Sequence, residues 1–173
     1  MNAADARSAL ARARALQEAV RGATRPHSEV TAPADQPVLP HSMFADTRGY
    51  IEKVVFQINR SYSSTSYDAC AVMMRRLLEM LIIEAFEHHG IATKIKGGSG
   101  DFLQLGDMIP VVLAETKWNL GRNSKRALPR LKDIGDKSAH DRRYNAKRQY
   151  IDELIIDLRT VAEELLYLAA LKK

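Results

Sequence analysis

The apolar residues of the C-terminal segment recur at alternating spacings of three and four, which is the repeat of one face of an α-helix. This seam consists of Ile151, Leu154, Leu158, Val161, Leu165 and Leu168. A seam of this kind packs against other helices, within one domain or between subunits. No run with the two-residue period of a β-strand competes with it. The sequence therefore predicts an all-α domain.

Other segments predict helices that pack around the same core. One helix is expected over residues 48–62, with its apolar residues on one face. Residues 67–89 are apolar nearly all round, so we expect this helix to be the central and most buried one, with Gly90 as its left-handed cap. Two more helices should carry residues 102–112 and 128–134. Together these segments predict a bundle of four to five helices.

The N-terminal quarter has a different composition. Residues 1–21 are rich in Ala, Leu, Arg and Gln and predict an additional N-terminal helix. Residues 22–45 contain four prolines without periodicity, which is typical of a linker. We therefore expect the compact helical domain to comprise residues 46–173.

Positive charge is concentrated in one segment of this basic chain, whose net charge is +5. Residues 117–148 contain eleven Lys and Arg against three acids, so this segment carries +8 and the rest of the chain −3. Such a concentration suits a phosphate backbone, and Trp118, Tyr144 and Tyr150 are available for stacking. A solvated helix face accounts for the same charges, and both interpretations stay open. The candidate RNA-binding residues are Lys132, Lys137, Arg142, Arg143, Lys147 and Arg148.

His140 is the candidate residue for proton transfer. Lys132, Asp136 and His140 recur every four residues and share one helix face. The charged form of a histidine near a helix C-terminus is favoured by the helix dipole, and Asp136 can orient the ring or raise its pKa. The alternative is that His140 only caps the helix end.

Charged residues also interrupt the most apolar helix. Glu79 lies four residues after Arg75 and three after Arg76. A buried helix carries such charges when they are paired, so we expect a structural ion pair among these residues. An arginine that faces phosphate is the functional alternative.

Cofactors, metals and membranes have little support in the sequence. His88 and His89 lack a second ligand pair at metal spacing, so no metal and no cofactor are expected. No apolar run reaches the roughly 18 residues needed to span a bilayer. Cys70 has no cysteine to pair with, which fits a cytoplasmic protein.

Three segments together are similar to a known family. They are residues 67–79, which contain Arg-Leu-Leu-Glu; residues 134–140, which contain Gly-Asp-x-x-Ala-His; and residues 163–167. In this order they resemble the bacterial domain of unknown function 4145 (DUF4145), which in turn resembles the HEPN superfamily of helical domains. The resemblance covers about residues 48–171.

This resemblance implies a helical bundle that often dimerises, with an Arg, a polar residue and a His on a late helix. In catalytic members these residues form a metal-independent endoribonuclease site across the dimer, and many members act in toxin–antitoxin pairs or phage defence. The histidine corresponds to His140 and the polar residue to Asp136. The arginine position falls on Gly135, so the motif is incomplete.

Two hypotheses follow from these observations. The first is an RNA-directed, HEPN-like module that works as a homodimer, with or without catalysis by His140 and Asp136. The second is a non-enzymatic interaction domain in which Gly135 permits close approach of two helices and the basic segment binds a partner protein.

Overall fold

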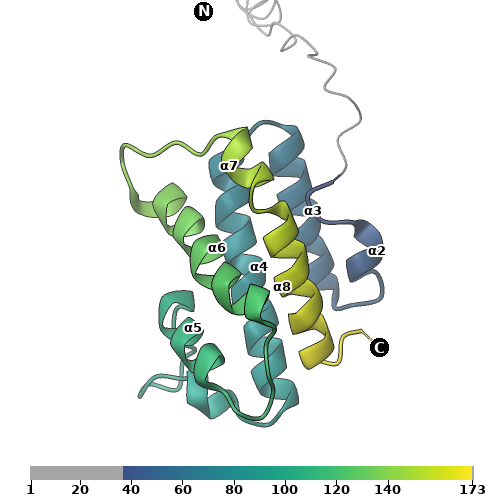
Figure 1. Ribbon diagram of the computed structural model, residues 1–173, viewed down its shortest axis with the longest axis vertical. Coiled ribbons are helices and arrows are strands. Elements are labelled where there is room, and N and C mark those ends of the chain that lie inside the picture. Colours follow the sequence, from purple (N-terminus) through teal and green to yellow (C-terminus); the bar gives the residue numbers. More distant parts are fainter. Residues whose placement is uncertain (1–36, 173) are drawn as a thin grey trace, which may run out of the picture. The chain divides into compact units, whose positions relative to one another are not determined.

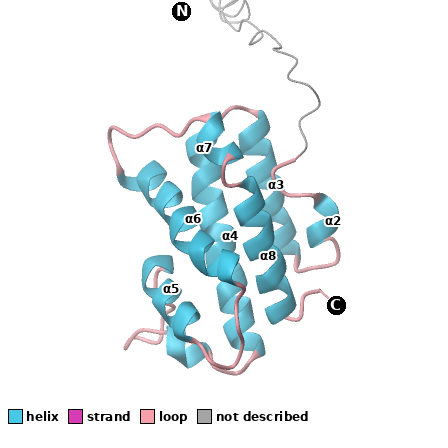
Figure 2. Cartoon of the chain, viewed as in Figure 1, coloured by secondary structure: helices cyan, strands magenta, loops and turns pink. Residues whose placement is uncertain are grey.

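A computed structural model describes residues 37–172 of this chain, and these residues fold as an all-α bundle (Figures 1 and 2). The predicted fold class is confirmed. The N-terminal helix expected at 1–21 and most of the expected linker lie outside the described residues. The helices are α2 (His41–Phe44), α3 (Gly49–Ser63), α4 (Tyr67–His88), α5 (Leu105–Ala114), α6 (Arg122–His140), α7 (Arg148–Asp152) and α8 (Ile155–Leu168), with a 3₁₀ turn at Ala92–Ile95.

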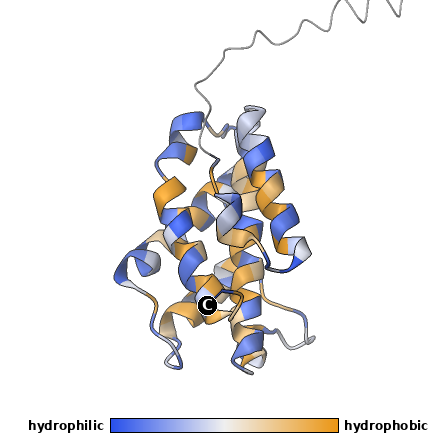
Figure 3. Cartoon of the chain, turned by 90° about the vertical axis from the view of Figure 1, so that its right-hand side faces the viewer, coloured by the Kyte–Doolittle hydropathy of each residue, from blue (hydrophilic) through white to orange (hydrophobic). Residues whose placement is uncertain are grey.

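Helix α4 is the centre of the bundle, as its apolar composition predicts. It packs against α3, α6 and α8, and also contacts α5, α7 and the 3₁₀ turn (Figure 1). The helices carry both hydrophobic and hydrophilic residues, and their buried hydrophobic residues form the core (Figure 3). Ten of the residues of α4 are buried: Cys70, Ala71, Met74, Leu77, Leu78, Leu81, Ile82, Glu84, Ala85 and Phe86.

Gly90 ends α4 in the left-handed conformation, as predicted, with a φ of 67°. The amide of Gly90 donates to the carbonyl of Glu87 (3.0 Å), and that of Ile91 donates to Phe86 (2.9 Å). This pair of hydrogen bonds is the Schellman motif, which satisfies carbonyls at the helix end. Helix α3 ends in the same way, but there the left-handed residue is Thr65, with a φ of 59°. A β-branched residue is strained in that conformation.

The folded domain begins earlier than residue 46, where the sequence placed its start. Val38, Leu39 and Phe44 are buried in the core. The side chain of Asn59 on α3 holds Leu39 through both backbone groups, accepting from its amide (3.0 Å) and donating to its carbonyl (2.8 Å). The prolines around these residues suggest a linker, but the buried apolar side chains beside them anchor the segment to the core.

The C-terminal seam is buried as expected, but it belongs to two helices and not to one. A turn at residues 153–154 separates α7 from α8, and Ile151, Leu154 and Leu158 remain in the core on both sides of it. A loop of residues 141–147 joins α6 to α7 (Figure 1). This loop and the end of α6 carry most of the residues singled out in the sequence.

Candidate nucleic-acid interface

At Gly135, α6 packs tightly against α4. A Cβ atom on residue 135 would lie 2.6 Å from the Cβ of Arg75 and 3.1 Å from the carbonyl oxygen of Ala71. Real Cβ atoms essentially never come within 3.0 Å of another heavy atom. The missing side chain therefore allows the two helices to pack at this distance, and the packing leaves no room for an arginine at this position.

Asp136, the next residue, is bound by two cations. Its Oδ1 accepts from Nε of Arg75 (2.6 Å), and its Oδ2 contacts Nζ of Lys132 (2.5 Å). Burial raises the pKa of the Asp136 carboxyl, but the hydrogen bonds and charges of Lys132 and Arg75 outweigh this effect and hold the pKa below its usual value. Asp136 is therefore an ionised part of a link between α4 and α6.

Of the three α4 residues expected to form an ion pair, two join this link and one faces solvent. Arg75 also approaches Glu79, with 3.6 Å between Nη1 and Oε2. Arg76, the third residue of the expected ion pair, is exposed and forms no ion pair with another residue of the described chain. The sequence missed the tightest partner of Arg75, Asp136, because it lies 61 residues away and no local spacing indicates it.

His140 lies apart from this network. It is the last residue of α6, it is exposed, and its side chain has no hydrogen bond or ion pair with any residue between 37 and 172. Both carboxylate oxygens of Asp136 are occupied by Arg75 and Lys132, so Asp136 does not orient the imidazole ring. The expected contact between Asp136 and His140 is thus wrong for this structure.

The six predicted RNA-binding residues fall into two groups. Three are held by carboxylates one helical turn away: Lys132 by Asp136 (2.5 Å), Lys137 by Asp133 (2.7 Å) and Arg148 by Asp152 (3.5 Å). The other three are exposed, lie in the loop between α6 and α7, and have no ion pair within the described part of the chain: Arg142, Arg143 and Lys147. Together with His140 they form what we call the cationic loop.

Two aspartates give the cationic loop its shape. The side chain of Asp141 accepts from the amide of Arg143 (2.9 Å), which closes a turn just after α6. The side chain of Asp68, in the first turn of α4, accepts from the amide of the buried Ala146 (2.9 Å). These two bonds fix the loop at both ends while Arg142 and Arg143 point to solvent. Because both carboxylates bind backbone amides, the structure gives neither a contact with a loop cation.

A groove of about 210 Å³ lies beside the cationic loop. It is formed by α6, by Tyr144 of the loop and by residues 150–154. The rings of Tyr144 and Tyr150 are close to parallel, with 22° between their planes and 6.3 Å between their centroids. Of the groove residues, the sequence singled out Lys137, Tyr144 and Tyr150. Trp118, the third candidate for stacking, is instead buried against Phe86.

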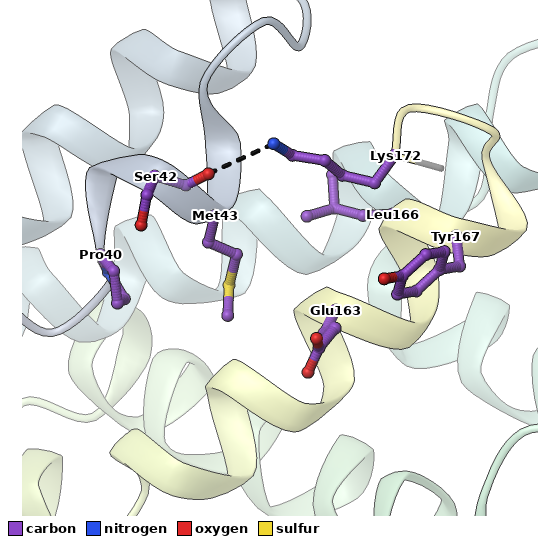
Figure 4. Close-up of a pocket in the computed structure, with 7 residues that line it drawn as sticks. All are labelled: Pro40, Ser42, Met43, Glu163, Leu166, Tyr167 and Lys172. Atoms are coloured by element: carbon purple, nitrogen blue, oxygen red, sulfur yellow. Dashed lines mark hydrogen bonds between the residues drawn. The ribbon is translucent and has the colours of Figure 1, made fainter.

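A second pocket, of about 240 Å³, lies between α2 and α8 (Figure 4). Met43, Glu163 and Tyr167 contribute side chains to it, and Nζ of Lys172 donates to the carbonyl of Ser42 (3.2 Å). None of the candidate catalytic or RNA-binding residues lines this pocket. We therefore place the candidate interface at the cationic loop and its groove.

Within residues 37–172, no group of three or more His, Cys, Asp or Glu side chains is placed to hold a metal ion. The described part of the chain also has no helix long and apolar enough to cross a membrane. Comparisons with protein-family models, curated proteins and solved structures found no match to this chain.

Proposed function

We propose that this chain is an RNA-binding module and that the cationic loop is its phosphate-binding surface. The observation that carries the proposal is the state of Arg142, Arg143 and Lys147, which are exposed and have no carboxylate partner within the described residues. A cation without a partner exchanges only water and counterions when it binds phosphate, whereas a paired lysine must first leave its carboxylate. Each cation of the loop therefore contributes more to phosphate binding than a paired cation of α6.

The geometry favours binding over catalysis. A ribonuclease of the HEPN type needs a cation beside its histidine to stabilise the charge that develops on phosphate. Position 135 cannot supply it, because a side chain there would collide with Arg75. Arg75 itself is engaged by Asp136 and Glu79. Beside His140 only the exposed loop arginines remain, and no contact within residues 37–172 fixes either of them at the imidazole, so the proposal is for RNA binding without catalysis.

A salt titration tests the binding surface. Single-stranded RNA of mixed sequence is titrated with wild type and with the double variant Arg142→Ala/Arg143→Ala. Each phosphate contact on a single strand adds about 0.7 to the slope of log affinity against log salt concentration, so the double variant should lose about 1.4. The matched control is Arg122→Ala/Arg126→Ala, which removes the same charge from the far end of α6, about 21 Å or more from His140 by helical rise. Equal slopes for the two double variants would contradict the proposal.

A cleavage assay tests the non-catalytic assignment separately. Total RNA is incubated with the protein in EDTA, and the products are examined for cyclic-phosphate ends. We expect no cleavage by wild type or by His140→Ala, while RNA binding persists. Cleavage by wild type that disappears in His140→Ala would overturn this assignment and restore His140 as a general acid or base.

The resemblance to HEPN-like domains adds a homodimer, a cytoplasmic location and a role in phage defence or a toxin–antitoxin pair to the proposal. Two exposed apolar side chains favour self-association: Phe56 on α3 is 66% exposed and Ile156 on α8 is 75% exposed. Light scattering at tens of micromolar should give twice the chain mass of 19.4 kDa. A mass of one chain at that concentration would remove the dimer from the proposal.

A further inference from the structure

The groove beside the cationic loop has the shape and lining of a site for one planar ring. Tyr144 and Tyr150 present nearly parallel rings, and Ile134 and Leu154 add apolar surface. Its volume of about 210 Å³ lies below the roughly 300–1,000 Å³ of pockets for drug-sized ligands, so it suits a single ring system better than a larger molecule. Unpaired bases of RNA bind to proteins by stacking on aromatic side chains in this way.

The charges around the groove add chemical selectivity. Lys137 is paired with Asp133 at 2.7 Å, and Arg130 with Asp157 at 2.7 Å. Glu153 also lines the groove and is exposed, and its side chain has no hydrogen bond or ion pair with another described residue. A carboxylate only accepts hydrogen bonds when ionised, so Glu153 is complementary to an N–H donor on the ligand. Carboxylates accept from exocyclic amino groups, such as N4 of cytosine.

The chain order connects the groove to the phosphate-binding surface. Tyr144 follows Arg142 and Arg143 directly, so the wall of the groove and the cations of the loop belong to one short segment. The hydrogen bond from the amide of Ala146 to Asp68 fixes this segment to α4. An RNA strand whose phosphates contact the loop is therefore beside the groove, where one of its bases can turn inward.

We infer that this groove binds one unpaired base of single-stranded RNA against Tyr144 and Tyr150, and that Glu153 selects bases carrying an exocyclic amino group over uracil. This inference rests on the proposed function, since the loop cations hold the strand. It adds a base-binding site and a preference for amino-bearing bases over uracil that phosphate contacts alone do not provide.

Fluorescence anisotropy with labelled oligoadenylate, oligocytidylate and oligouridylate of equal length tests the inference, at low salt and in EDTA. Wild type should bind the first two more tightly than oligouridylate. Tyr150→Leu keeps an apolar side chain but removes the ring, and should weaken binding of all three by about 5- to 150-fold. Tyr150→Phe keeps the ring and should bind like wild type. The matched control is Tyr167→Leu, on an exposed tyrosine of α8 that does not line the groove.

Glu153→Ala tests the selectivity, because it removes both hydrogen-bond acceptors of this side chain, and its exposed position makes misfolding a minor concern. It should reduce the ratio of affinities for oligoadenylate and oligouridylate to near one, whether or not overall affinity rises with the loss of a negative charge. An unchanged ratio would overturn the role of Glu153. Tight binding that depends on Arg142 and Arg143 but not on the ring of Tyr150 would overturn the base site and leave the proposed function standing. No binding of any oligonucleotide would refute both.

Discussion

The close crossing of α4 and α6 makes Gly135→Ala the most informative single substitution in this domain. Its new Cβ would lie 2.6 Å from the Cβ of Arg75, about 1 Å short of an ordinary carbon–carbon contact of about 3.5–4.0 Å. The next nearest atom, 3.1 Å away, is the backbone carbonyl oxygen of Ala71. Neither atom moves when a side chain rotates, so relief requires the helices themselves to shift.

Two opposing contributions set the change in the free energy of unfolding of Gly135→Ala. Overpacking of a close-packed interior costs about 1–3 kcal/mol, and a contact this short to a Cβ belongs at the upper end. Alanine is better than glycine in a helix by about 1 kcal/mol, which opposes the loss. We therefore expect Gly135→Ala to lower the free energy of unfolding by about 2 kcal/mol. Gly135→Arg, which completes the expected motif, should be still less stable.

Urea unfolding followed by circular dichroism measures this change, with Gly49→Ala as the matched control. A Cβ on residue 49, at the start of α3, meets nothing within 4 Å. In that variant only the higher helix propensity of alanine changes the stability. It should therefore be as stable as wild type or more stable, by up to about 1 kcal/mol. If Gly135→Ala matches Gly49→Ala, the helices tolerate a side chain at 135, and the steric argument against an arginine there is refuted.

Three further predictions concern other parts of the fold. Thr65→Gly should raise the free energy of unfolding by about 1 kcal/mol, because glycine adopts the φ of 59° without strain, whereas Gly90→Ala should lower it; a loss in Thr65→Gly would contradict this. Hydrogen bonds from Lys94 and from the amide of Lys117 lower the pKa of Glu115 from 4.5 to about 2, so its contribution to stability is complete above pH 4.5 and is lost as the pH falls through about 2. The urea midpoint of wild type should therefore fall between pH 4.5 and 2, and that of Glu115→Gln should fall less. If the midpoints of the two proteins fall in parallel, these bonds do not stabilise the fold. Burial raises the pKa of the Cys70 thiol to about 12, so a disulfide reagent at pH 8 should react only after urea is added; immediate reaction of the native protein would place this thiol outside the core.

The helices of this domain were predictable because their signal is local. Apolar spacing placed α3, α4 and α6, and a glycine marked the end of α4, since both depend on residues within one or two turns. The same reasoning put the domain start at residue 46, although Val38 and Leu39 are buried. Their contacts are with residues far along the chain, such as Asn59 and Arg159, which no local pattern reveals.

The candidate site was less predictable for the same physical reason. A spacing of four correctly brings Lys132 to Asp136 and Arg75 to Glu79. It does not reveal that Arg75 crosses to Asp136 from another helix, or that this contact removes Asp136 from His140. Charge patterns along a helix give the possible pairs, while tertiary packing decides which of them form.

For the proposed RNA binding, the relevant quantity is the charge that has no carboxylate partner and not the total charge. Counted along the chain, the basic segment is uniform, but four of its helical cations have carboxylate partners. Those of Lys132, Lys137 and Arg148 lie one turn away, and that of Arg130 is Asp157 on α8. In the loop, the nearest carboxylates bind backbone amides instead: Asp141 binds the amide of Arg143, and Asp68 that of Ala146. The aspartates therefore order the loop without occupying its cations. A rigid segment with unoccupied cations loses less entropy on binding than a flexible one, so phosphate should prefer this loop to the more numerous charges of the helix.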